Sequence, residues 1–260
     1  MDYYSKPRQF LRGVRQLLYP RRCPFCGRVL GSISVCTACA DERERLRRKP
    51  GMRLDVSQHY LGDLSGAAAP FEYKGCVRRG VLRAKYQASP WNAVEFGVWM
   101  AHLLFGSEIE MYGAEPVPQK VDAAYLAYDC IVPVPASSWR RGYNVPELMS
   151  RPLAKALGLP VEAKALQRVR HGKHQAGLSF EERMVNAAGA FQVKKPELVE
   201  GRRILLVDDV ITTGATAAAC TQALIKAGAQ SVFAVSLATV EFSECPSGKK
   251  PIYEEADDTD

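Results

Sequence analysis

The sequence predicts an α/β fold, in which helices flank a mostly parallel sheet and a small cysteine-rich segment precedes it. Strand patterns alternate with helix patterns along the chain, which is typical of parallel sheets. Residues 204–207 and 231–240 are apolar runs rich in β-branched residues, as buried strands require. Such sheets bind ligands at the carboxyl ends of their strands, so polar residues there are the first candidates for a site.

The individual elements follow from periodicity and from turn residues. The expected helices span 75–86, 91–105, 143–157 and 217–227, and the expected strands span 131–135, 204–207 and 231–240. In the third helix, Pro146 suits a first turn, whereas Pro152 predicts a kink or a split. The strand at 131–135 ends on prolines, which lack the N–H that a central ladder needs. Gly228 is placed to end the last helix.

Residues 203–216, RILLVDDVITTGAT, carry the strongest functional signal. Two carboxylates follow a buried strand, and a turn rich in threonine leads into a helix. A helix N-terminus offers N–H groups and a positive dipole end to a phosphate, while carboxylates accept hydrogen bonds from hydroxyls. A ribose 5-phosphate has both a phosphate and a diol. The predicted contacts are Asp208, Asp209, Thr212, Thr213, Gly214, Ala215 and Thr216. The alternative is an ordinary strand–turn–helix unit, in which these residues serve only as turn and cap.

Composition and charge exclude several classes of protein. No apolar stretch approaches the roughly 20 residues of a membrane span, and residues 1–15 lack the apolar core of a signal peptide, so a cytoplasmic location with free thiols is expected. The chain contains neither G-x-x-x-x-G-K-[ST] nor G-x-G-x-x-G, which argues against a P-loop or a dinucleotide fold. Residues 1–53 carry 13 Lys and Arg against 4 Asp and Glu. This excess suggests a polyanionic partner, or else only a solvated surface.

Two C-x-x-C pairs near the N-terminus can present four sulfurs to one ion. The candidate ligands are Cys23, Cys26, Cys36 and Cys39. Four thiolates at this spacing are typical of a structural zinc site, with a redox pair and an iron–sulfur cluster as alternatives. The segment is too short for a core of its own, so metal binding would supply its folding energy. The negative charge of four thiolates could be offset by the neighbouring Arg21, Arg22 and Arg28.

Residues 168–178 are basic, contain glycine and lack periodicity, so they are expected to form a mobile loop. Such a loop could close over a pyrophosphate and neutralise it, and a solvated surface loop is the alternative. The candidate catalytic residues in this loop are Arg168, Arg170, Lys173 and His174.

The order of motifs resembles the ComF family of bacterial competence proteins, which join a zinc-binding segment to a type I phosphoribosyltransferase domain. Besides the cysteine pairs, the matching motifs are Tyr73-Lys-Gly75, Lys85-Tyr86, Val132-Pro-Val-Pro135, Arg141-Gly-Tyr-Asn144, Gln175-x-x-Leu178 and Asp-Asp-Val-x-Thr-Thr-Gly at 208–214. The resemblance implies that phosphoribosyl pyrophosphate (PRPP) binds with Mg²⁺. Its ribose hydroxyls would contact the acidic pair, Asp208 and Asp209, and its 5-phosphate would contact the threonine turn, residues 212–216. Further candidate contacts, to pyrophosphate or nucleic acid, are Lys85, Arg140 and Arg141.

Two functions follow from this resemblance. In the first, the chain binds PRPP or a ribose 5-phosphate and acts in DNA uptake, with single-stranded DNA and the uptake machinery as partners. In the second, it is an active Mg-dependent phosphoribosyltransferase of nucleotide metabolism with an unknown acceptor. The chain departs from the family where Val145 and Pro146 replace an expected Gln, which concerns turnover more than ribose-phosphate binding. The expected division is a basic four-cysteine segment at 1–50, a phosphoribosyltransferase-like domain at 51–245 and an acidic disordered tail at 246–260.

Overall fold

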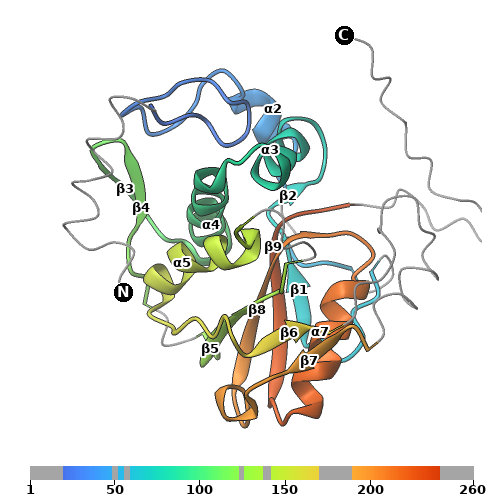
Figure 1. Cartoon of the computed structure of the whole chain (residues 1–260). Helices are drawn as coiled ribbons and strands as arrows, with labels where there is room; N and C mark the ends of the chain where they lie inside the picture. Colours follow the sequence, from blue (N-terminus) through green and yellow to red (C-terminus); the bar gives the residue numbers. More distant parts are fainter. Residues whose placement is uncertain are drawn as a thin grey trace, which may run out of the picture.

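The central element of the computed structural model is a five-stranded sheet (Figure 1). The structure describes residues 20–48, 52–55, 59–122, 126–136, 142–169 and 189–240. The strands are β1 (Gly66–Ala68), β2 (Phe71–Glu72), β5 (Cys130–Pro133), β8 (Arg203–Ile211) and β9 (Ser231–Thr239). Their order is β1-β9-β8-β5, β2 also pairs with β9, and every pairing is parallel. The predicted mostly parallel sheet is therefore confirmed.

Helices cover both faces of this sheet. They are α2 (Ala40–Arg45), α3 (Gly75–Tyr86), α4 (Pro90–Phe105), α5 (Val145–Leu157) and α7 (Ala215–Lys226), with a short 3-10 helix η2 (Pro196–Leu198). Figure 1 shows α7 along one face and α4 and α5 at the other. Because side chains alternate along a strand, Leu205 and Val207 of β8 pack in the core with α3, α4 and α5, whereas Ile204 and Leu206 pack with α7. No helix of the described ranges is long and apolar enough to span a membrane.

Most predicted elements agree closely with the observed ones. α3 has the predicted bounds, and α4 and β9 differ from the prediction by a single residue. α5 continues through Pro152 without a split, and Pro146 lies in its first turn as expected. α7 begins two residues earlier than predicted, because Gly214, with φ of 85°, is its N-cap.

β8 corrects the prediction at the acidic pair. The apolar run was expected to end before the two carboxylates, but the strand continues to Ile211. Asp208 is in register with Ser236 of β9, and Ile211 with Thr239. Asp208 is therefore part of the ladder and Asp209 lies within the same strand, with only 9% and 7% of their surface exposed. Their backbone is fixed by the sheet and not by a loop.

Two small antiparallel pairs were not predicted. β3 (Ile109–Tyr112) pairs with β4 (Glu115–Pro118), and β6 (Leu166–Arg168) pairs with β7 (Phe191–Val193). Strands of four residues or fewer are too short for their alternation to be recognised. β6 also corrects the prediction for Arg168, which lies on this strand opposite Phe191 and not in a mobile loop.

The cysteine segment packs against the helices of the larger domain. Its buried side chains belong to the same core as α3, α4 and α5. The ring of Phe25 lies 5.6 Å from the rings of Phe71 and Phe96 and 5.7 Å from that of Trp99, measured between centroids. The cysteine segment is too short to form a hydrophobic core of its own, and its buried side chains pack into the core of the parallel-sheet domain.

Candidate functional site

The acidic pair lies beside the N-terminus of α7 and is joined there by a lysine from α3. The backbone N–H of Asp209 donates to Oδ1 of Asp208 at 2.8 Å, which fixes the first carboxylate. Nζ of Lys85 lies 2.8 Å from Oδ1 of Asp209, and 24% and 10% of the two side chains are exposed. The structure thus brings Lys85 together with the predicted acidic pair.

Burial and charge act on this group together. Burial and the adjacent Asp209 carboxylate raise the pKa of Asp208 to about 7. Burial by itself would lower the pKa of Lys85, but the charge of Asp209 outweighs it, and the pKa of Lys85 is raised. Lys85 is therefore a cation at neutral pH, while Asp208 is close to the midpoint of its titration. Such a site can accept hydrogen bonds from a diol and offer a cation to a phosphate.

Tyr73 belongs to the same group. Burial raises the pKa of its phenol, and Lys85 and Asp209 are the charged groups that act on it most strongly. Its backbone N–H donates to the carbonyl of Thr239 at 2.7 Å, which ties it to the end of β9. Its motif was recognised in the sequence, but no role was predicted for it.

The turn between β8 and α7 rests against a distant segment. Gly214 has φ of 85°, and a Cβ there would lie 2.3 Å from the backbone oxygen of Tyr60. The N–H of Tyr60 donates to the carbonyl of Thr213 at 2.9 Å. Glycine is required both by the left-handed backbone and by this contact. Thr213 is buried, while Thr212 and Thr216 are half-buried. N–H groups at a helix start have no partner within the helix, so this turn is suited to an anion.

His59 anchors the segment that supports the turn. Its Nε2 lies 2.9 Å from Oγ1 of Thr239 and 3.1 Å from the carbonyl oxygen of Val240. The Thr239 hydroxyl donates to the carbonyl of Ile211 at 2.8 Å, so it accepts from Nε2–H of His59. Burial lowers the pKa of His59, which favours the neutral ring. His59 thereby links the segment before Tyr60 to the ends of β8 and β9.

Arg168 approaches the acidic pair from β6. Its guanidinium carbon lies 4.5 Å from the centroid of the Phe191 ring. Burial lowers the pKa of Arg168, and Cys220 and Asp208 are the groups whose charges oppose this effect. Its Nε is buried and has no hydrogen-bond acceptor among the described residues. The other predicted basic residues, namely Arg140, Arg141, Arg170, Lys173 and His174, lie outside the described residues.

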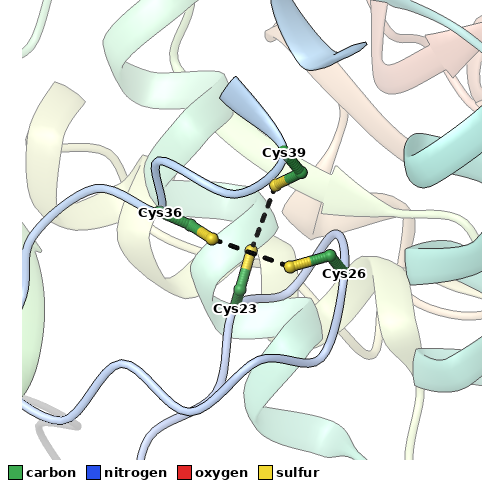
Figure 2. A group of neighbouring side chains, drawn as sticks. All are labelled: Cys23, Cys26, Cys36 and Cys39. Carbon is green, nitrogen blue, oxygen red and sulfur yellow. Dashed lines mark hydrogen bonds between the residues drawn. The ribbon is translucent and has the colours of Figure 1, made fainter. Parts of the chain in front are cut away.

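The four predicted cysteines form one cluster (Figure 2). All four sulfurs lie within 4.8 Å of one another. The sulfurs of Cys23 and Cys39 are 3.6 Å apart, as are those of Cys26 and Cys36. Sulfurs at about 2.3 Å from one tetrahedral zinc ion would be about 3.8 Å apart. The cluster therefore has the size of a four-thiolate site, and it is the only potential metal cluster found in the described part of the chain.

Burial favours the protonated, neutral form of the Cys23 and Cys39 thiols. Burial raises the pKa of Cys23 to about 11, and burial and the charge of Cys23 raise that of Cys39. Burial also acts to raise the pKa of Cys26, but hydrogen bonds from the Arg28 backbone and the Cys36 thiol outweigh it and lower the pKa. A bound metal ion displaces the thiol protons, so it would allow all four sulfurs to be thiolates. Four sulfurs this close together thus fit a metal ion.

The arginine that faces the sulfurs was not predicted. Nη1 of Arg43 lies 3.8 Å from Sγ of Cys39, and its guanidinium lies 4.6 Å from the centroid of the Trp99 ring. Arg21 instead forms a buried ion pair with Glu95 of α4, at 2.7 and 2.9 Å. Its charge is neutralised there, so Arg43 is the better placed to offset the thiolates.

Only weak signals in the sequence point to the supporting residues that were missed. Tyr73 lies in a recognised motif, so its position beside a basic helix was the one available clue. Nothing near His59 or Tyr60 marks them, since both act on residues more than 150 positions away. Arg43 lies one helical turn after Cys39 and could have been found from this i, i+4 spacing.

Residues 147–260 match the model of the phosphoribosyl transferase domain. The chain is 41% identical over 107 residues to the DNA utilization protein YhgH of Salmonella typhi, a stretch that covers 40% of the chain and 46% of that protein. It is 40% identical over 109 residues to competence protein F of Haemophilus influenzae, covering 40% of the chain and 47% of that protein. The chain thus spans about half the length of the curated relatives it matches.

Two solved structures align with part of the chain at 21% identity. One is described as the allosteric regulatory enzyme of purine biosynthesis, with a TM-score of 0.33 over 55% of this chain and 25% of that one. The other is glutamine phosphoribosylpyrophosphate amidotransferase from B. subtilis with ADP and GMP, with a TM-score of 0.34 over 57% of this chain and 26% of that one.

Proposed function

We propose that this chain, a relative of competence protein F that carries a phosphoribosyl transferase domain, binds PRPP or a ribose 5-phosphate and acts in DNA uptake. The observation that carries the proposal is the arrangement at the end of β8. Two buried carboxylates, Asp208 and Asp209, stand beside the start of α7, where Gly214 lets the turn pack closely against the backbone of Tyr60. An acidic pair next to an anion-binding turn suits a molecule that has both a diol and a phosphate.

Each half of the ligand has its own chemistry in this arrangement. The 5-phosphate accepts hydrogen bonds from the N–H groups and hydroxyls of residues 212–216, at the positive end of the α7 dipole. The ribose hydroxyls donate to Asp208 and Asp209. Lys85, an ammonium already next to Asp209, offers charge to the pyrophosphate side of PRPP, and Arg168 is a second cation for the same group. Mg²⁺, when bound with PRPP, supplies further neutralisation of the pyrophosphate.

The proposal includes a structural zinc ion on the four cysteines. Zinc is preferred because four thiolates in a closed tetrahedron are its usual structural environment. A reducing cytoplasm would keep these thiols available to it. Single-stranded DNA is the proposed partner because the names of the relatives refer to competence and DNA utilization, and because the N-terminal segment is basic. Metal analysis that finds no zinc, or finds iron with visible absorbance, would contradict the metal assignment.

Ligand binding can be tested with a pair of matched variants. Wild-type protein is expected to gain about 2.7 kcal/mol of unfolding free energy when PRPP with Mg²⁺ is present at 100 times its Kd. The double variant Asp208→Asn, Asp209→Asn should lose this gain. Asp129→Asn is the control, because Asp129 pairs with Arg203 on the surface at the opposite end of β8. If PRPP and ribose 5-phosphate leave wild-type unfolding unchanged, the proposed ligand is wrong.

Phosphoribosyl transfer is the second candidate function. It is favoured by the two cations, Lys85 and Arg168, near the acidic pair, because they could stabilise the charge of departing pyrophosphate. The bond from C1 to pyrophosphate would break with oxocarbenium-like character, and no protein nucleophile is required. The test is pyrophosphate release from PRPP and Mg²⁺ with candidate bases or amines. Release that the double variant abolishes supports the enzyme, whereas binding of PRPP and salt-sensitive binding of single-stranded DNA without release support the binding function.

A further inference from the structure

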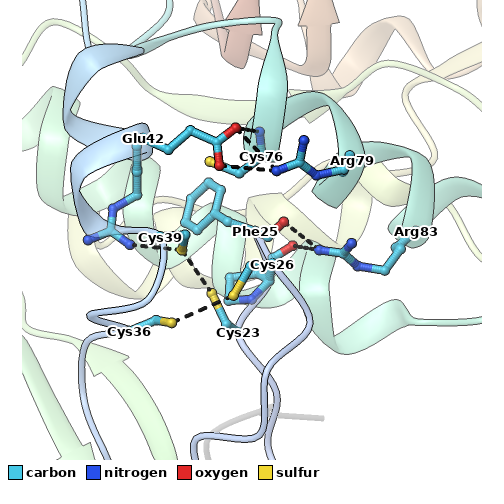
Figure 3. A network of polar contacts seen from close by, with 11 residues as sticks. Cys23, Phe25, Cys26, Cys36, Cys39, Glu42, Cys76, Arg79 and Arg83 are labelled. Carbon is cyan, nitrogen blue, oxygen red and sulfur yellow. Dashed lines mark hydrogen bonds and ion pairs between the residues drawn. The ribbon is translucent and has the colours of Figure 1, made fainter. Parts of the chain in front are cut away.

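Helix α3 directly contacts the turn between Cys23 and Cys26, called the first metal turn below. Nη2 of Arg83 donates to the carbonyl of Pro24 at 3.2 Å and to that of Phe25 (Figure 3). Both carbonyls belong to the turn between Cys23 and Cys26. A Cβ on Gly80 would lie 2.4 Å from the Pro24 oxygen, so the turn rests on the helix with no room for a side chain between them. One face of α3 is therefore packed against the first metal turn.

The second cysteine pair is attached to the other end of α3. α2 starts at Ala40, directly after Cys39. Its Glu42 accepts a hydrogen bond from the backbone N–H of Cys76 at 2.8 Å and pairs with Arg79 at 3.1 Å. The carboxylate thereby satisfies an N–H of the first turn of α3, where negative charge is favourable. Both halves of the metal cluster are thus held on α3 by polar contacts.

The same helix supplies the cation of the ribose-phosphate site. Lys85 follows Arg83 by two residues and pairs with Asp209 at 2.8 Å. Between them, the carbonyl of Ala84 accepts the hydroxyl of Tyr143 at 2.6 Å, which further fixes the last turn of the helix. A rigid helix with both ends tied to the metal segment therefore carries the ammonium that faces the acidic pair.

We propose that Arg83 is a positioning residue that couples occupancy of the cysteine cluster to ligand affinity at the acidic pair. The inference rests on the proposed ribose-phosphate function. A bound metal ion fixes the Cys23–Cys26 turn, the turn holds Arg83, and Arg83 holds the end of α3 that places Lys85. Without the ion, the two carbonyl acceptors are released and Lys85 is less well placed for a pyrophosphate. Because coupling between two binding sites is reciprocal, the ligand must also increase metal affinity by the same factor.

The coupling can be measured from both sides in the full chain. Zinc affinity is determined by competition with a chromogenic chelator, with and without PRPP and Mg²⁺, and PRPP affinity is determined for zinc-loaded and zinc-free protein. Wild-type protein is expected to show the same shift in both directions, about fivefold or more. Free PRPP can itself bind zinc and so change the apparent zinc affinity. Lys85→Met, which is expected to bind PRPP weakly, measures this contribution separately.

Arg83→Met tests the assigned residue, and Arg83→Lys and Arg151→Met serve as comparisons. With zinc bound and the fold intact by circular dichroism, Arg83→Met should lose most of the reciprocal shift, and Arg83→Lys should retain part of it. Arg151→Met removes an equal charge from a surface pair with Glu147 and should keep the full shift. If Arg83→Met fails to fold, the two-way measurement on the wild type still decides, because equal PRPP affinity with and without zinc overturns the coupling.

Different results would contradict the proposed ribose-phosphate binding and the proposed coupling through Arg83. If zinc-loaded wild-type protein binds neither PRPP nor ribose 5-phosphate, the proposed function is wrong and the coupling falls with it. If PRPP binds equally well with and without zinc, the function stands and the coupling is wrong. If the shift is present but Arg83→Met retains all of it, the coupling does not pass through Arg83.

Discussion

The contact between Gly214 and Tyr60 allows a prediction whose two physical causes can be separated. In Gly214→Ala, the new Cβ would have to exist at φ of 85° and would lie 2.3 Å from the Tyr60 oxygen and 3.0 Å from its carbonyl carbon. The opposing atoms are backbone, and the segment that carries them is tied down by the hydrogen bonds of His59 and Tyr60. Relief therefore requires a shift of the turn itself.

The expected cost has a backbone part and a steric part. A left-handed conformation costs a residue with a Cβ about 1–2 kcal/mol, and forcing extra volume into a packed site costs about 1–3 kcal/mol more. Gly106 provides the matched control, because it has φ of 72° and a Cβ there would meet nothing within 4 Å. Gly106→Ala should thus show the backbone part alone.

Urea unfolding of the two variants measures the difference, and PRPP binding measures its consequence. Gly214→Ala should be less stable than Gly106→Ala by about 1–3 kcal/mol and should also lose PRPP affinity, because the turn proposed to hold the 5-phosphate has moved. Gly106→Ala should bind PRPP like the wild type. Equal stability of the two variants would refute the steric argument, and unchanged PRPP affinity in Gly214→Ala would refute the assignment of this turn to the phosphate.

Three further predictions concern buried charges. Lys85→Met leaves Asp209 without its cation and should lower the free energy of unfolding by about 3 kcal/mol; an unchanged urea midpoint would contradict the pairing. Arg21→Met should lower the free energy of unfolding by about as much, because Glu95 remains buried alone. The double variant with Glu95→Leu should regain part of this stability, whereas two independent losses would make the double variant less stable than either single variant. Asp208 has a folded pKa of about 7, above its usual 3.8, so the stability from its neutral form is fully present below about pH 4 and is lost as the pH rises through about 7, by at most about 1.4 kcal/mol per pH unit. Asp208→Asn should remove this component from the measured pH profile, and identical profiles would show that Asp208 does not titrate in this range.

The sequence was most informative where local chemistry decides the structure. The bounds of α3 follow from its periodicity, and the cysteine cluster follows from the spacing of its two pairs. The segment from Asp208 to Thr216 could be recognised because its carboxylates, glycine and threonines are adjacent in the chain. α3 and the cysteine cluster need little information from elsewhere in the protein, so they were predicted with their residues. The ligand contacts of the segment from Asp208 to Thr216 stay a prediction.

Features set by tertiary contacts could not be predicted in the same way. β8 extends past the acidic pair because β9 offers a partner as far as Thr239, and no property of residues 208–211 alone indicates this. The pairing of Arg21 with Glu95 joins residues 74 positions apart. Arg168 looked like part of a mobile loop because its partner strand, β7, is three residues long. In each case the deciding neighbour is distant in sequence.

The extension of β8 also explains how two adjacent carboxylates can be buried together. Successive side chains of a strand point to opposite faces, so Asp209 shares a face with Val207, and Asp208 shares one with Leu206. The first face is covered by α3 and the second by α7. Asp209 accordingly meets Lys85 from α3, while Asp208 lies near Cys220 of α7 and Arg168. Had the strand ended at Val207, both carboxylates would lie in a loop with no fixed division between the faces. The placement of the two carboxylates on opposite faces thus lets Lys85 pair directly with Asp209, while the charges of Lys85 and Arg168 together oppose the rise in the pKa of Asp208.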